Sequence, residues 1–460
     1  MKHLKEWLER LRRQPQHPLS STHYWQQDAL NVLADCDEQS DWLQLSRNSN
    51  GFVREVAVRV LCDTPSPQAL LALVERLNDW VAQVRQLAER GVQQYLHPNQ
   101  ADALLYALEP LLALAGKGRC NPDAILQQMA EVLSRPELHA ALIEALNGRR
   151  GKGARFLFEL LLKSEAGALP TTLQIAMKHA DTDVRRMALT ASRRLPQAEA
   201  RVLLRLGFAS PSAQIRVTAL REWLAQDEQL PQIQNLLRLG LLDPAPAVRC
   251  LACWAAPRYQ INSSDVLMLG LAEQPTDKNG WLGLIGLAKE LVETRALPTL
   301  QIALLHTAPV VRSRALEAIA AIAPDDVLAT LLSALDDPST QVVRAASRLL
   351  KRQPIRTGDE QLSAAIVSSL RQGESRKLVT LAALTPLWIH LQHLLQALEI
   401  AEDEGQREGL LAALNIWHKR RRRAYALRAT AEQQALLSTH LLTLMAAGKL
   451  EHCDPQYWIN

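Results

Sequence analysis

One short recurring pattern constrains this chain more than any other feature of its sequence. An aliphatic residue followed by arginine returns along the chain, each time just after a turn and at the start of a Leu/Ala-rich stretch with helical spacing. The arginines are separated by 31, 100, 31, 33, 63 and 32 residues, so the long gaps are close to three and two periods. A fixed period of this length indicates a repeat architecture. The arginines are Arg54, Arg85, Arg185, Arg216, Arg249, Arg312 and Arg344.

The same period extends the array beyond these positions. One period after Arg249 lies near Trp281, where the helical pattern continues but the arginine is absent. After Arg344 the period reaches Arg376 and then Arg407, in stretches that keep the Leu/Ala face. We therefore predict about twelve units.

Each unit has the pattern of a helical hairpin. Apolar residues within Val327–Leu335 lie on one stripe of a first helix. Asp337-Pro338 then predicts a new helix start, because aspartate is a good N-cap and proline suits the first helical position. A second apolar stripe follows within Val342–Leu350. Neither helix can bury its face alone, so neighbouring hairpins must stack into a solenoid.

The pattern from Asp243-Pro244 through Val248-Arg249 to Ala252 resembles HEAT repeats, particularly the short variety named after phycobilisome-lyase proteins. The resemblance covers most of the chain and implies an all-α fold, a right-handed α–α superhelix of about twelve helical hairpins. The patterns of tetratricopeptide and ankyrin repeats are absent. The predicted domains are an N-terminal helical cap (1–45), a HEAT-like repeat array (46–423) and a C-terminal helical cap (424–460).

A Gly-rich segment interrupts the pattern between Arg85 and Arg185. Residues 147–155 (NGRRGKGAR) stand where a capped turn is expected, which predicts a register break or an inserted loop. Its glycines would let the backbone approach a phosphate closely, although a flexible basic loop without a ligand is the alternative. The candidate anion-binding or partner-binding residues here are Arg149, Arg150, Lys152 and Arg155.

A second basic cluster follows the last clear repeat. Five consecutive cations cannot all occupy the solvent face of a helix, so some are expected at a helix end or in a turn. A solvated turn between repeats is one interpretation, and a patch for nucleic acid or an acidic protein is the other. The residues are Lys419, Arg420, Arg421, Arg422 and Arg423.

The repeated arginines also allow two roles. Because the guanidinium pairs bidentately with carboxylate or phosphate, the row could fix the stacking of adjacent units or bind anions along one face. The resemblance to HEAT repeats favours the structural role, and we therefore predict that the seven arginines form a structural ladder.

No catalytic motif is present among those for nucleotide, dinucleotide, hydrolase or zinc-protease sites. Cys250 and Cys253 form a C-x-x-C inside a repeat helix, where core thiols are expected instead of a metal site. His390 and His393 could share a helix face but lack complementary ligands nearby in the sequence. We predict no catalytic residue, no metal and no cofactor.

The functional prediction rests on the fold and on tryptophan. Ten tryptophans are present, and any exposed ones would be the best anchors for a partner. We predict a non-enzymatic protein-binding scaffold or adaptor in a bacterial cytoplasm, unanchored to membrane, with an accessory or immunity factor of a toxin, secretion or defence system as a narrower form. A nucleic-acid-binding solenoid resembling HEAT-like DNA glycosylases is the alternative, and a lyase-type enzyme is another. The net charge of only +4 disfavours nucleic acid.

Overall fold

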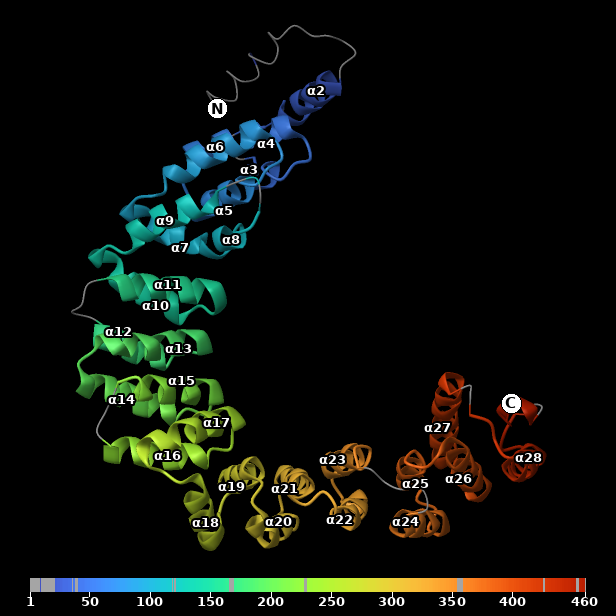
Figure 1. The fold of residues 1–460 in the computed structure, drawn as a ribbon. Coiled ribbons are helices and arrows are strands. Elements are labelled where there is room, and N and C mark those ends of the chain that lie inside the picture. Colours follow the sequence, from blue (N-terminus) through green and yellow to red (C-terminus); the bar gives the residue numbers. More distant parts are fainter. Residues whose placement is uncertain are drawn as a thin grey trace. The chain divides into compact units, whose positions relative to one another are not determined.

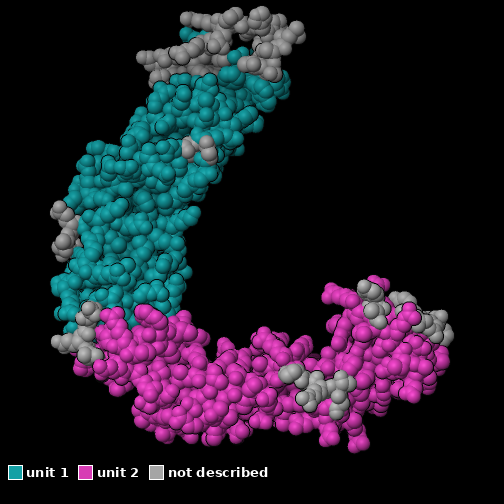
Figure 2. Space-filling view, in the orientation of Figure 1, with its two compact units in different colours: residues 1–228 teal, residues 229–460 magenta. Residues whose placement is uncertain are grey.

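The computed structural model divides the chain into two compact units, residues 1–228 and 229–460, which Figure 2 colours separately. Every regular element among the described residues is a helix, and none of these residues forms a strand (Figure 1). The described residues are 9, 21–34, 36–37, 40–117, 119, 121–164, 169–226, 230–353, 359–424, 427–451 and 455–459.

The first unit is a stack of helices in which successive helices pair. Helix α10 packs against α11, α12 against α13 and α14 against α15, while α13 also packs against α11 and α15. Among the described residues, 3-10 turns at Pro98–Gln100, Pro136–Leu138 and Ser192–Arg194 join these helices. The helices are α2 (Ser21–Leu33), α3 (Trp42–Leu45), α4 (Gly51–Asp63), α5 (Pro67–Arg76), α6 (Ala82–Gln93), α7 (Ala101–Tyr106), α8 (Leu108–Ala113), α9 (Pro122–Leu133), α10 (His139–Asn147), α11 (Gly151–Lys163), α12 (Leu169–Met177), α13 (Thr182–Ala191), α14 (Gln197–Phe208) and α15 (Ala213–Leu224).

The second unit repeats this arrangement. Helix α16 packs against α17, α18 against α19, α20 against α21 and α22 against α23, and the second helices α19, α21 and α23 follow one another in contact. Its 3-10 turns are Ala256–Tyr259, Thr294–Ala296 and Ala334–Asp336. The helices are α16 (Leu230–Leu241), α17 (Pro246–Ala255), α18 (Ser263–Glu273), α19 (Lys278–Leu291), α20 (Leu297–Ala303), α21 (Pro309–Ile322), α22 (Leu328–Ser333), α23 (Thr340–Leu350), α24 (Glu360–Arg371), α25 (Ser375–Ala382), α26 (Leu387–Ile400), α27 (Glu404–Arg423), α28 (Ala431–Ala446) and α29 (Gln456–Ile459).

Apolar residues at helical spacing build the core of each unit. In α23 the buried side chains are Val342, Ala345, Ala346 and Leu350, which recur three or four residues apart and so share one face. The same spacing buries one stripe of each long helix, and the stacked hairpins cover these stripes. The predicted all-α fold of helical hairpins is therefore confirmed.

The aspartate of the repeat does not cap the second helix as predicted. In the unit of α22 and α23 the N-cap is Ser339, and Asp337 lies two residues earlier. One carboxylate oxygen of Asp337 accepts a hydrogen bond from the Ser339 backbone N–H at 2.8 Å. Asp243 does the same for the Ala245 N–H at 2.8 Å. The aspartate therefore shapes the turn before the helix, as short polar side chains commonly do, and keeps its second oxygen for another partner.

Residues 147–155 are not an inserted loop. Helix α10 ends at Asn147 and α11 begins at Gly151, so the turn between them is short. Gly151 has a φ of +70°, a conformation that glycine adopts without strain. A Cβ on Gly153 would lie 2.0 Å from a carboxylate oxygen of Glu109 in α8, so this glycine permits close packing of α11. The glycines serve a turn and a helix contact.

Helices at both ends continue the stacking. Helix α2 packs against α4, and α28 packs against α26. Much of the predicted N-terminal cap lies outside the described residues. The predicted boundaries of the caps stay a prediction. No helix among the described residues combines the length and the apolar character needed to cross a bilayer.

Candidate partner-binding surfaces

Among the seven ladder arginines, Arg54, Arg249 and Arg312 form largely buried ion pairs with residues of the following hairpin. Arg54, near the start of α4, donates from Nε and Nη2 to both carboxylate oxygens of Asp79, at 2.8 and 2.9 Å. Its Nη1 donates to the backbone carbonyls of Asn48 and Ser49, each at 2.8 Å. The side chains of Arg54 and Asp79 are 3% and 1% exposed. Burial raises the pKa of Asp79, but the hydrogen bonds and charge of Arg54 outweigh it and lower that pKa overall.

The same geometry returns in the second unit. Arg312 of α21 donates from Nε and Nη2 to the two carboxylate oxygens of Asp337, each at 2.7 Å, and from Nη1 to the carbonyls of His306 and Thr307. The hydrogen bond from Arg312 lowers the pKa of Asp337. Each of these two arginines thus links the turn of its own hairpin to the turn of the next.

Other ladder arginines vary this theme. Arg249 donates to the carbonyl of Asp243 and binds Glu290 of α19, with Nη2 at 2.6 Å. Arg85 donates to the carbonyl of Asp79 at 2.7 Å, and Arg216 to that of Ser210 at 2.9 Å. Arg185 donates from Nη2 to Thr182 at 3.2 Å.

Arg344 differs from the rest of the ladder. Its side chain is exposed, and it makes no hydrogen bond or ion pair with any residue that the structure describes. The prediction that Arg344 fixes the stacking angle therefore needs correction. Its neighbour Arg348 instead pairs with Glu317 of α21 at 3.1 Å.

The first basic cluster is divided between structural and free cations. Arg149 donates to the carbonyls of Ala145 and Leu105, at 3.0 and 2.7 Å. Arg155 forms an ion pair with Asp183. The Gly151 N–H, which a phosphate would need, donates to Asp181 at 2.6 Å. The following two cations of the cluster are exposed and unpaired among the described residues: Arg150 and Lys152.

The second basic cluster lies in a helix and not in a turn. All five cations belong to the last turns of α27, with Ala424 as the C-cap, so they lie at a helix end, one of the two expected places, and the interpretation as a solvated turn is wrong. Arg420 donates from Nη1 to the Ala383 carbonyl at 3.3 Å. Cations at a helix C-terminus face the negative end of the helix dipole and are stabilised by it. Three of the cluster are exposed and make neither a hydrogen bond nor an ion pair with a described residue: Lys419, Arg422 and Arg423.

Helix α26 carries His390 and His393, and His390 lies next to Arg420 of this cluster. Burial, the nearby charge of Arg420 and His393 together lower the pKa of His390 to about 4. Nδ1 of His390 lies 3.4 Å from Nη1 of Arg420. Burial also lowers the pKa of His393, whose Nδ1 lies 3.3 Å from Oε1 of Gln396. No group of three His, Cys, Asp or Glu side chains among the described residues is placed to hold a metal ion.

The expectation that both thiols of the C-x-x-C are in the core is wrong for one of them. Cys250 is exposed on α17 and Cys253 is half-buried. Burial raises the pKa of Cys253, and the charge of Glu290 adds to that effect. Cys250 therefore lies on the solvent side of α17, and the helical spacing of the sequence did not predict this exposure.

Two tryptophans near the repeat helices are strongly exposed. Trp80, between α5 and α6, is 69% exposed, and Trp254 of α17 is 74% exposed. The guanidinium carbon of Arg54 lies 5.4 Å from the centre of the Trp80 ring, so a cation–π contact holds the indole in place. The buried tryptophans of the repeats are Trp223, Trp281, Trp388 and Trp417.

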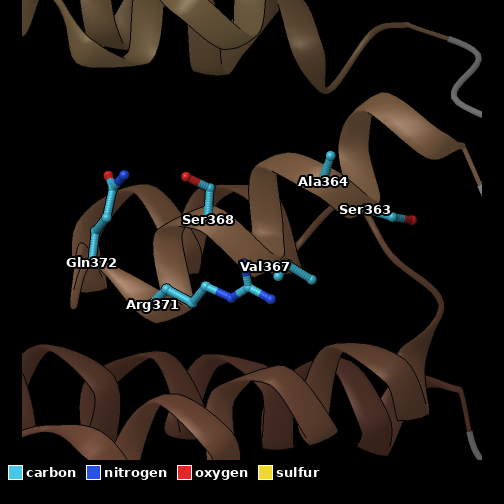
Figure 3. Close-up of a pocket in the computed structure, with 6 residues that line it drawn as sticks. All are labelled: Ser363, Ala364, Val367, Ser368, Arg371 and Gln372. Carbon is cyan, nitrogen blue, oxygen red and sulfur yellow. The ribbon is translucent and has the colours of Figure 1, made fainter.

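The surface also carries shallow grooves. A space of about 510 Å³ lies along α24 (Figure 3), and a second of about 630 Å³ lies between α16 and α18. In Figure 3 the labelled side chains all project from α24 alone, so this space is one open face of a helix. The groove between α16 and α18 has two walls and is the better candidate for binding.

Comparison with known proteins identifies the repeat. Residues 264–351 match the family model for HEAT repeats. This segment of the chain is similar to HEAT repeats. The predicted resemblance is confirmed over these residues, which span α18 to α23.

Two solved structures align over most of the chain. One is an engineered protein, 15% identical, with 91% of this chain and 99% of that chain covered and a TM-score of 0.21. The other is Kap121p, 16% identical, with 92% of this chain and 50% of that chain covered and a TM-score of 0.34. No curated protein matches the sequence.

The main residues that sequence analysis missed are the acceptors of the ladder. Asp79 and Asp337 each lie 25 residues after the arginine that they bind, and this spacing is a signal that the sequence contains. Arg155 was grouped with a basic loop although it precedes Arg185 by 30 residues, close to one period. Arg155 is the fifth residue of α11, and its ion pair with Asp183 of α13 links it to the next hairpin.

Proposed function

We propose that this protein is a non-catalytic cytoplasmic scaffold that binds another protein through its HEAT-like repeats. The observation that carries the proposal is the pair of exposed tryptophans, Trp80 and Trp254. Tryptophan is enriched among the residues that dominate binding energy, because its large rigid ring buries much apolar area at little entropic cost. Stacked hairpins provide long surfaces for such contacts.

The test is affinity purification of the tagged full chain from its source cells, with nuclease treatment and a salt wash, followed by mass spectrometry. We expect a stoichiometric protein partner that survives both treatments. Trp254→Ala or Trp80→Ala should weaken its binding at least about tenfold, the effect of losing a hot spot. Tyr106→Ala, which removes an exposed aromatic ring of α7, is the matched control. Retention of full affinity by both tryptophan variants would contradict the proposal.

The narrower role, an accessory or immunity factor of a bacterial toxin, secretion or defence system, depends on the identity of that partner. Capture of a toxin or a secretion component would support the narrower role. Capture of a partner from an unrelated process would remove it and leave the scaffold in place.

A second candidate function is nucleic-acid binding, favoured by the unpaired cations at the end of α27. Lys419, Arg422 and Arg423 stand on consecutive turns with no acidic partner among the described residues. If they contact phosphates, affinity for duplex DNA should fall steeply with salt. Changing all three to alanine should then reduce the slope of log K against log salt by about 2 to 3. An unchanged slope would assign these cations to another role.

A further inference from the structure

Helix α18 carries more apolar surface than its packing uses. Its polar residues lie at the two ends, and the run Val266–Ala272 between them is apolar all round, yet among the residues of α18 only Leu267 is fully buried. Its main packing partners are α16 and α19. A helix that is apolar all round normally lies inside a core. The exposed apolar surface of α18 is therefore a candidate binding surface.

The uncovered face of α18 forms one wall of the groove of about 630 Å³. The other wall is the C-terminal half of α16, with Leu239, and the residue after this helix, Leu242. Leu239 and Leu269 stand at the groove and are 65% and 60% exposed. Two exposed leucines facing one hollow form an apolar floor that water covers in the free chain, and burying it is favourable.

Two residues with an unusual backbone conformation flank this helix, and one of them, Gln260, lines the groove. Among the described residues, the non-glycine residues with positive φ are Gln260 before α18, Gln274 after it, and Val292 at the end of α19, with φ of 58°, 53° and 52°. A β-branched residue such as Val292 is rarely found in this conformation. Strained backbone persists where the surrounding structure enforces it, and it clusters at binding sites. The strain is an observation independent of the apolar surface.

The length of the groove suits a helix. Its lining on the α18 side runs from Asn262 to Glu273. Eleven residues of helix extend about 16 Å, or three turns. A groove of this kind accepts the apolar stripe of a partner helix, read as side chains at positions i, i+3, i+4 and i+7.

The charges at the rim of the groove determine which charged residues a partner helix would carry on either side of its apolar stripe. The α18 wall carries the carboxylates of Asp265 and Glu273, whereas the α16 wall carries Arg238. Arg238 and Glu273 are exposed and make no ion pair with a described residue. A partner helix with a basic residue on one flank and an acidic residue on the other would satisfy both walls and fix its own direction.

We propose that the groove between α16 and α18 is a docking site for an amphipathic helix of a partner protein, with basic residues toward α18. This inference rests on the proposed scaffold function and adds a second surface, distinct from the exposed tryptophans, with a defined chemistry of partner.

The test is selection of helical 18-residue peptides from a phage-displayed library against the wild-type full chain. We expect enriched peptides with apolar residues at i, i+3, i+4 and i+7 and with Lys or Arg on one flank. Leu269→Asp and Leu239→Asp should each lower the affinity of the chain for these peptides at least tenfold. Leu206→Asp, on an equally exposed leucine of α14, is the control and should leave their affinity unchanged. Circular dichroism and thermal melting establish that each variant is folded.

A charge reversal tests the rim separately. With Glu273→Lys, selection should change the preferred flank from Lys or Arg to Asp or Glu. Enriched peptides whose affinity does not depend on Leu239 or Leu269 would overturn the proposal. So would a wild-type dimer, measured by light scattering, that Leu269→Asp converts to monomer, because a second copy would then occupy the groove. A partner lost with Trp254→Ala but insensitive to Leu269→Asp would overturn this inference and leave the scaffold function standing.

Discussion

At the scale of single residues, equivalent arginines of the repeats have different energetic roles. Arg54 is buried with Asp79, whereas Arg344 is exposed and has no partner among the described residues. The free energy of such a side chain depends on what its removal leaves behind. Loss of Arg54 leaves the buried Asp79 carboxylate with only Arg76, at 3.3 Å, and the Val81 N–H as partners, and a buried charge that has lost its main partner is strongly unfavourable. Loss of Arg344 leaves nothing uncompensated.

We therefore expect Arg54→Ala and Arg344→Ala to differ in stability. Arg54→Ala should lower the free energy of unfolding by about 3 to 5 kcal/mol. Arg344→Ala should change it by no more than about 0.5 kcal/mol. Urea denaturation followed by circular dichroism measures both. Equal losses from the two variants would show that exposure does not separate structural from dispensable arginines.

His390 makes the stability of α26 depend on pH. Its pKa of about 4 in the folded chain, lowered by burial and by Arg420, lies below the ordinary value of about 6.5. Between these values the unfolded chain binds more protons, so stability is complete above about pH 6.5 and falls as the pH drops toward 4. The loss should reach roughly 3 kcal/mol. Hydrogen exchange of α26 should accelerate over this range, and His390→Gln should remove most of the change; an unaltered pH profile would assign it to other groups.

At the scale of elements, α19 explains the missing arginine of the pattern. A Cβ on Gly286 would lie 2.2 Å from the guanidinium carbon of Arg249, so this glycine leaves room for the arginine of the preceding hairpin. Arg249 then binds Glu290 within α19 itself. Trp281, at the position expected for the arginine, is buried against His306. The repeat keeps a link between hairpins but supplies it with different residues.

Gly283 shows how closely α19 approaches its neighbour. A Cβ there would lie 1.8 Å from the carbonyl oxygen of Leu242, a backbone atom that cannot rotate away. Gly283→Ala should therefore lower the free energy of unfolding by at least about 2 kcal/mol. Gly409→Ala in α27, where a Cβ would meet no atom within 4 Å, should raise it by about 0.5 to 1 kcal/mol. Thermal melting of both variants measures the difference, and destabilisation by Gly409→Ala would contradict the assignment.

The sequence was sufficient to predict the helices, but it did not predict which side chains of those helices are exposed. The stripe within Val342–Leu350 predicts a helix face because burial follows a 3.6-residue period. The same period cannot distinguish Trp254, which is exposed, from Trp223, which is buried, because both lie on repeat helices. Exposure depends on the neighbouring hairpin. The docking groove likewise depends on how α18 packs, and its apolar sequence alone predicts burial.

At the scale of the whole molecule, stability is a sum of local terms. Within each unit a helix contacts mainly its own hairpin and the next one, as α13 contacts α12 and α15. Such an array resembles a one-dimensional chain of neighbours, in which a local defect affects adjacent repeats and weakens with distance. A single free energy of unfolding therefore describes the protein less completely than a profile along the chain.

The Arg54→Ala variant tests this locality. Arg54 and Asp79 join α4 to the turn before α6, so their loss should increase amide exchange in α4, α5 and α6. Helices α26 and α27 of the second unit should retain the exchange rates of the wild type. They lie many repeats away from Arg54 and Asp79 along the chain, and in a repeat array the effect of a local defect weakens over one or two repeats. Hydrogen exchange with mass spectrometry gives both profiles in one experiment. An equal acceleration across both units would show that the chain unfolds as one cooperative body and that the ladder stabilises all of it at once.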